Sequence, residues 1–230
     1  MSHDAGRYEL IGVDQMEATI VRRLLHPWND SDAARIYPIL RALEAYDVLP
    51  VGRIKRPRWE LTVYPLCYLA GTAGANAEER RVDYVYDALR SAVGASEYDA
   101  GNLRAQINSV VNCEIDVLIE DESYFVLLEV KILSPGQRRV KFGRCNKTGL
   151  HQLVRQYVQG RLLERLTGKS FVLATVGANG GRPFEVVLTH DEVALVSLVT
   201  TTKTDRLRIV DVQWSEAWRD GVEGSSAVDP

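Results

Sequence analysis

Residues 114–132 read EIDVLIEDESYFVLLEVKI. Two runs in which aliphatic residues alternate with other residues are separated by the polar turn EDES at residues 120–123. A period of two predicts two β-strands, at 114–119 and 124–133, that pair as a hairpin with one aliphatic face toward the core.

The polar side chains of the hairpin are expected on the other face. With a turn of two or four residues, the numbers of two residues that lie opposite each other add up to an odd number. Even-numbered residues of the first strand then share a face with odd-numbered residues of the second, so Asp116, Glu129 and Lys131 become direct or diagonal cross-strand neighbours. Mg²⁺ prefers oxygen ligands and can be held by an aspartate and a glutamate. A lysine ammonium can stabilise charge on a phosphate or orient an attacking water. We therefore predict Asp116 and Glu129 as metal ligands and Lys131 as the catalytic cation.

The surrounding pattern predicts an α/β fold with a mixed central β-sheet flanked by helices. Helical spacing predicts helices at residues 15–25, 31–46, 76–93 and 150–166. Further strands are predicted at residues 103–111, 171–176, 184–188, 193–199 and 207–212, after an irregular or short-strand connector at 47–64. We expect an N-terminal helical segment over 1–70, a main domain over 71–218 and a disordered tail over 219–230.

Composition excludes several classes of protein. The net charge is -3 and the sequence pI about 5.9, so nucleic-acid affinity must come from a local patch or from metal ions. Three cysteines without a Cys-x-x-Cys pair argue against a disulfide framework and a structural zinc. No apolar run approaches about 18 residues, and the first residues lack the basic and apolar regions that are typical of a signal peptide, so we expect neither a membrane span nor a signal peptide. We expect a soluble, cytoplasmic protein without a membrane partner.

The run CEIDVLI at residues 113–119, followed by Leu128-Glu129-Val130-Lys131, resembles the PD-(D/E)XK nuclease superfamily. The resemblance covers roughly residues 72–218, where a helix, a three-strand meander and a helix follow in the family's order. Ile115 stands where the motif's name has proline. The resemblance implies a restriction-endonuclease-like fold and Mg²⁺-dependent hydrolysis of phosphodiester bonds, with Mn²⁺ expected to substitute. The expected substrate is nucleic acid, with DNA as the leading hypothesis and RNA still open, and the expected role is repair, restriction or defence.

Other readings stay open beside this one. The hairpin can be a solvent-facing element with incidental charges, or part of a nuclease-like module that binds nucleic acid or a protein partner without cleaving. Symmetric cutting of both strands would need a two-fold dimer, so a homodimer or larger assembly is also an open expectation.

Many members of the superfamily add a carboxylate from the helix before the meander. Glu79, at the edge of the predicted apolar stripe of the helix at 76–93, is our candidate for this catalytic and metal-binding role. Glu78 is its nearest competitor and Glu17 a weaker one. The alternative is that acidic residues simply favour the first turn of a helix because of its dipole.

The helix after the hairpin resembles the glutamine-bearing helix of the superfamily. Gln152 is therefore a catalytic candidate, although a surface glutamine without a role is the alternative. Gln156 stands where exonuclease-like branches have tyrosine, so exonuclease action is not inferred. His151 is expected to be a capping or surface residue.

Five cations follow the catalytic strand in a loop that also carries three glycines. Placed there, they could contact a phosphate backbone, which would let an acidic protein bind nucleic acid. The alternative is a solvated loop. The predicted nucleic-acid-binding residues are Arg138, Arg139, Lys141, Arg144 and Lys147.

Overall fold

The structure is a computed structural model of the 230-residue chain, and it describes residues 33–50, 58–66, 100–131, 141–201 and 204–213. Within these residues, six strands form one mixed sheet in the order β1-β2-β3-β4-β6-β5. The pairs β1–β2, β2–β3 and β5–β6 are antiparallel, whereas β3–β4 and β4–β6 are parallel. The strands are β1 (Arg58–Val63), β2 (Ile115–Glu120), β3 (Tyr124–Val130), β4 (Ser170–Val176), β5 (Phe184–Val187) and β6 (Arg206–Val212).

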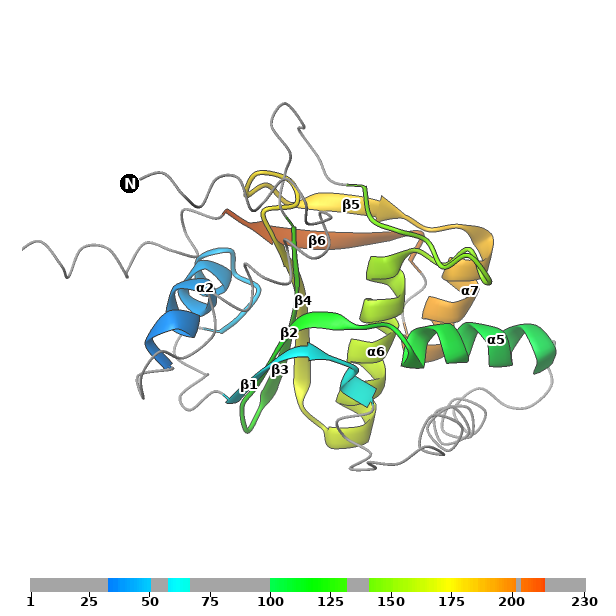
Figure 1. The fold of residues 1–230 in the computed structure, drawn as a ribbon, viewed down its shortest axis with the longest axis horizontal. Coiled ribbons are helices and arrows are strands. Elements are labelled where there is room, and N and C mark those ends of the chain that lie inside the picture. The colour runs from blue at the N-terminus through cyan, green and yellow to red at the C-terminus, as the bar shows by residue number, and fades with distance from the viewer. Residues whose placement is uncertain (1–32, 51–57, 67–99, 132–140, 202–203, 214–230) are drawn as a thin grey trace, which may run out of the picture.

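Helices cover both faces of the sheet, and the expected α/β fold class is confirmed (Figure 1). One face carries α2 (Ala33–Ala45), which confirms the helix predicted at 31–46. The other face carries α5 (Ala100–Val111), α6 (Gln152–Thr167) and α7 (His190–Val199). Because α6 connects the parallel strands β3 and β4, it forms the crossover that packs back onto the sheet.

Both faces of the hairpin are buried, which corrects the expectation of a single core side. Val117 and Ile119 join the cluster that packs against α2, whereas Leu118, Phe125 and Leu127 join the cluster beneath α5, α6 and α7. Central strands of a mixed sheet with helices on both faces are apolar on both sides. Polar residues in these strands are therefore costly to place and need specific partners.

Two predicted strands are helices. Residues 103–111 belong to α5, in which Leu103, Ile107 and Val110 recur at helical spacing and are buried. Residues 193–199 belong to α7, which begins with a capping box between Thr189 and Glu192. Both segments contain β-branched residues, which favour strands, but the helical period of α5 and the cap of α7 override that preference.

The first strand of the antiparallel meander is therefore β1, from the connector at 47–64, and not the segment at 103–111. Because β1 pairs with β2 and α2 packs on the sheet, the described part of residues 1–70 shares the core of the main domain. The helices predicted at 15–25 and 76–93 and the tail at 219–230 lie outside the described residues. No helix in the described part of the chain is long and apolar enough to cross a membrane.

Candidate active site

Two carboxylates of the hairpin lie opposite each other where β2 begins and β3 ends. The register pairs Val117 with Leu128, and continuing it by one residue brings Asp116 opposite Glu129, which confirms the odd index sum expected from the turn. Asp116 is half-buried, and its Oδ2 accepts a hydrogen bond of 2.7 Å from the backbone N–H of Val130. The side chain of Asp116 is thus held at the end of β3.

Glu129 is almost fully buried, with 2% of its surface exposed, and three side chains donate to its carboxylate. Lys131 Nζ lies 2.9 Å and Gln152 Nε2 2.6 Å from Oε1, and Gln156 Nε2 lies 2.6 Å from Oε2. Gln156 Nε2 also donates to the carbonyl of Glu114 at 3.1 Å. Oε1 is therefore oriented by Lys131, which follows β3, and by Gln152 of α6, and Oε2 is oriented by Gln156 of α6.

The two glutamines reach Glu129 because they lie one turn apart on the same face of α6. His151 is the N-cap of this helix, and its Nδ1 accepts from the backbone N–H of Leu153 at 3.2 Å. The expected capping role of His151 is confirmed. The cap fixes the point at which α6 begins.

Burial raises the pKa of Glu129, and the neighbouring Lys131, Gln156 and Gln152 lower it without cancelling the effect of burial. A carboxyl group in this position takes up a proton more readily than one in water. A cation bound to Glu129 would favour its ionised form.

The loop after β4 lies at the same edge of the sheet, because the backbone N–H of Lys131 donates to the carbonyl of Val176 at 2.8 Å. Its conformation is set by Asp211 of β6, whose fully buried carboxylate accepts from the backbone N–H groups of Ala178, Asn179 and Gly181 at 2.7–2.8 Å. The site thus lies at the carboxyl ends of the parallel strands β3 and β4, where α/β sheets commonly bind ligands.

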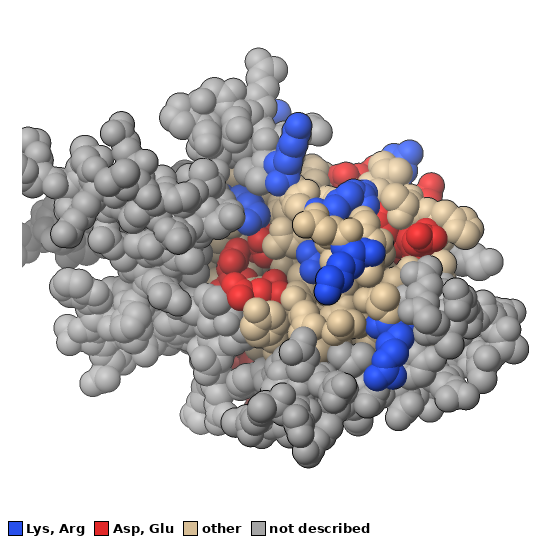
Figure 2. All heavy atoms as spheres, turned by 45° about the vertical axis from the view of Figure 1, so that its right-hand side comes forward, with Lys and Arg blue, Asp and Glu red and all other residues tan. Residues whose placement is uncertain are grey.

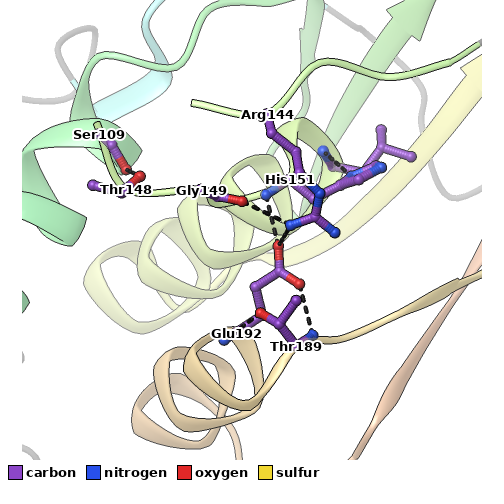
Figure 3. Close-up of polar contacts among 8 residues, drawn as sticks. Ser109, Arg144, Thr148, Gly149, His151, Thr189 and Glu192 are labelled. Atoms are coloured by element: carbon purple, nitrogen blue, oxygen red, sulfur yellow. Dashed lines mark hydrogen bonds and ion pairs between the residues drawn. The ribbon is translucent and has the colours of Figure 1, made fainter. Parts of the chain in front are cut away.

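The turn before α6 carries three of the predicted basic residues. Arg144 Nη1 donates to the carbonyl of Gly149 at 2.7 Å and to Glu192 Oε1 at 2.9 Å, and Glu192 Oε1 also accepts from the backbone N–H of His151 at 2.7 Å (Figure 3). Glu192 therefore ties the turn and the start of α6 to the start of α7. Lys141 and Lys147 are exposed.

The structure brings together Asp116, Glu129, Lys131 and Gln152 of the predicted site, and adds Gln156. Its spacing from Gln152 was visible in the sequence, but its contact with β3 depends on how α6 packs. Glu79, Arg138 and Arg139 lie outside the described residues.

The donor set fits a small, hard divalent cation. Asp116 and Glu129 offer carboxylate oxygens, and Mg²⁺ is commonly held by one or two carboxylates while it keeps several waters. The buried carbonyl oxygen Oε1 of Gln156 also has no hydrogen-bond partner. No cluster of three or more acidic, histidine or cysteine residues lies within the described part of the chain, so a third carboxylate would have to come from elsewhere.

In comparisons with known proteins, no family model, no curated protein and no solved structure matches this chain.

Proposed function

We propose that this chain is a metal-dependent nuclease of the PD-(D/E)XK type that hydrolyses phosphodiester bonds, with DNA as its expected substrate in repair, restriction or defence. The observation that carries the proposal is the opposition of Asp116 and Glu129 across the hairpin, with Lys131 Nζ 2.9 Å from Glu129. Two carboxylates that can hold a metal ion, and one cation beside them where β2 begins and β3 ends, are side chains suited to phosphodiester hydrolysis.

The roles follow from the contacts. Asp116 and Glu129 would hold Mg²⁺, or Mn²⁺ in its place, and a bound ion supplies polarisation of a phosphoryl oxygen and a lowered pKa of a coordinated water. Lys131 binds an oxygen of the scissile phosphate or orients the attacking water. Gln152 and Gln156 act as positioning residues, because they hold the carboxylate of Glu129. Glu79 remains our candidate for a further carboxylate.

The nucleic acid would approach over a face that carries cations. Figure 2 views the side on which α5 and α7 lie in Figure 1, and shows Lys and Arg side chains gathered near its middle with acidic side chains on either side. Lys141, Arg144 and Lys147 are exposed residues of the turn beside the site. Contacts of this kind supply affinity for any sequence. We also propose a cytoplasmic location, in line with the scarcity of cysteine.

The test is cleavage of single-stranded, double-stranded, nicked and circular DNA, and of matched RNA, with Mg²⁺, with Mn²⁺ and with EDTA. We expect cleavage that requires the metal and that falls by about 100-fold or more in Asp116→Asn and in Lys131→Ala. Asparagine keeps an oxygen that can accept from the N–H of Val130, so Asp116→Asn removes the charge and retains the fold. Glu122→Gln, an exposed change at the far end of the hairpin, is the matched control.

Full activity in folded Asp116→Asn and Lys131→Ala would exclude this site. A second function, binding without cleavage, is favoured by one observation: three side chains already donate to the carboxylate of Glu129, as they would in a purely structural cluster. Binding by the wild type with no hydrolysis of any substrate with either metal would establish that function instead.

A further inference from the structure

We propose that a hollow beside the candidate active site receives one unstacked base of a single-stranded nucleic acid together with a phosphate. This base site rests on the proposed function, because it takes a strand of the same substrate. The hollow has a volume of about 410 Å³ and lies between the basic turn, the loop after β4 and β5. Pockets for small ligands commonly measure roughly 300–1,000 Å³.

Its apolar surface is aromatic. The rings of Phe142 and Phe184 are nearly parallel, with an angle of 14° between their planes and 5.9 Å between their centroids. The ring of His151 lies 5.8 Å from that of Phe142. Val187, at the rim, is 62% exposed although it is apolar. Successive bases of single strands stack on such aromatic surfaces in proteins that bind them.

Its polar surface offers hydrogen-bond donors. Lys141 makes no ion pair with any described residue, and Arg144 uses only Nη1 for its contacts within the described part of the chain. His151 accepts at Nδ1, so its neutral ring presents a proton at Nε2. The carboxylate of Glu185, which also lines the hollow, is paired with Arg206 at 2.9 Å. An aromatic surface beside a cation, Lys141, that makes no ion pair among the described residues suits a group that is both flat and anionic, such as a nucleotide.

Both walls of the hollow are continuous with the candidate catalytic residues. On one side His151 immediately precedes Gln152, which donates to Glu129. On the other side Ala178 and Asn179 follow β4, whose Val176 pairs with β3. A base in the hollow would therefore flank a phosphate that Lys131, and a metal ion at Asp116 and Glu129, would bind. Because a base in a duplex is stacked and paired, this geometry favours a single strand or a frayed end.

The test measures binding in EDTA, so that no cleavage occurs. The probe is a short single-stranded DNA oligonucleotide that carries 2-aminopurine, whose fluorescence is quenched when the base stacks. We expect quenching by the wild type, and in Phe184→Leu a loss of quenching with about tenfold weaker binding. Phe171→Leu is the matched control, since Phe171 is also half-buried but packs against Tyr157 and does not line the hollow.

A second variant tests the phosphate contact and does not depend on an aromatic core residue. Lys141→Ala should lower the slope of log Kd against log salt by about 0.7, the value for one phosphate contact of a single strand. It should leave the quenching in place. Arg165→Ala, an exposed charge on α6 outside the hollow, should leave the slope unchanged.

Three results would overturn the base site: no binding of the probe by the wild type, equal quenching and affinity in Phe184→Leu and Phe171→Leu, or unquenched binding of duplex as tight as that of single strands. Its failure differs from that of the proposed function. Normal metal-dependent cleavage with unaltered binding in Phe184→Leu removes the base site alone. Intact quenching without any cleavage removes the nuclease and leaves a nucleic-acid-binding module.

Discussion

Glu129 is an acidic residue in a strand where the residues on either side of it, Leu128 and Val130, are buried and apolar. A buried carboxylate is tolerated when its oxygens are satisfied, and here one lysine and two glutamines do so. Gln156 is itself fully buried and also donates to the carbonyl of Glu114. Removing the amide of Gln156 takes this donor away from two acceptors, the carbonyl of Glu114 and Oε2 of Glu129.

We therefore expect Gln156→Leu, which keeps the size of the side chain, to lower the free energy of unfolding by about 1–3 kcal/mol. It should also reduce cleavage, because Glu129 Oε2 loses the group that orients it. Urea denaturation and initial cleavage rates measure the two effects. Arg165→Ala, on the exposed side of α6, serves as the control. Unchanged stability in Gln156→Leu would show that the hydrogen bond contributes nothing to the fold.

At the residue scale the sequence predicts that Asp116, Glu129 and Lys131 share one face of the hairpin, because the alternation of side chains along a strand is a local property. It does not predict Gln156 as a partner of Glu129. That contact depends on the rotation of α6 over β3, which is decided by packing between elements distant in sequence. The residue could be placed on the same helical face as Gln152, but the strand it faces could not be read from spacing.

At the scale of elements, Glu192 connects three segments through one buried carboxylate. Oε2 accepts from the backbone N–H of Thr189 at 2.8 Å and closes the capping box of α7, while Oε1 accepts from His151 and from Arg144. Burial raises the pKa of Glu192, but the hydrogen bonds from Thr189 and His151 and the charge of Arg144 outweigh burial and lower it below 4.5.

A carboxyl group with a lowered pKa stabilises the fold above its unfolded value and loses this contribution as the pH falls through its folded value. Glu192→Gln cannot accept at both positions, so we expect it to lower the free energy of unfolding at pH 7 by about 1–3 kcal/mol. The difference from the wild type should shrink as the pH falls below about 4.5, the ordinary value. Urea denaturation at a series of pH values measures this.

Glu185→Gln, which alters an exposed carboxylate paired with Arg206, is the control for the loss of one acidic group. A difference between wild type and Glu192→Gln that is the same at pH 7 and pH 4 would contradict a role for the ionised form.

The elements that the sequence predicts well are those with a single strong signal, such as α6, β3 and β4. The segments at 103–111 and 193–199 carry β-branched residues at helical spacing, so composition and period conflict. In α7 the cap decides the conflict, because Thr189 and Glu192 satisfy backbone N–H groups that a strand would pair with a neighbour. In α5 the burial of one helical face decides it.

At the scale of the whole molecule, the layers are held at close approach by a glycine. A Cβ at Gly160 of α6 would lie 2.8 Å from Cγ of Phe171 in β4 and nearer still to Cδ2 and Cε2 of the same ring. Gly160 is buried and Phe171 packs edge-on against Tyr157. The separation of helix layer and sheet is therefore set where these two residues meet.

In an exposed helix, Gly→Ala stabilises by up to about 1 kcal/mol. Here we expect Gly160→Ala to lower the free energy of unfolding by about 1–3 kcal/mol, because the added methyl group forces Phe171 or the helix to shift. In the Phe171→Ala background, Gly160→Ala should lower the free energy of unfolding by less than it does in the wild type, because the ring it clashes with is absent. A double-mutant cycle by urea denaturation measures this coupling. Additive effects of the two changes would contradict the proposed clash.

The sheet also joins segments that are synthesised far apart in time. Val63 of β1 pairs with Ile115 of β2, which closes a loop of roughly fifty residues, whereas a short turn joins β2 to β3. Hairpins form within about 1–10 μs, and distant pairing is slower. Because synthesis proceeds at about 5–20 residues per second, we expect β1 to leave the ribosome several seconds before β2. During that time the backbone groups of β1 that later pair with β2 have no strand to pair with. The nascent chain would then assemble its acidic hairpin first and recruit β1 afterwards, so a chaperone that shields extended segments would act on β1.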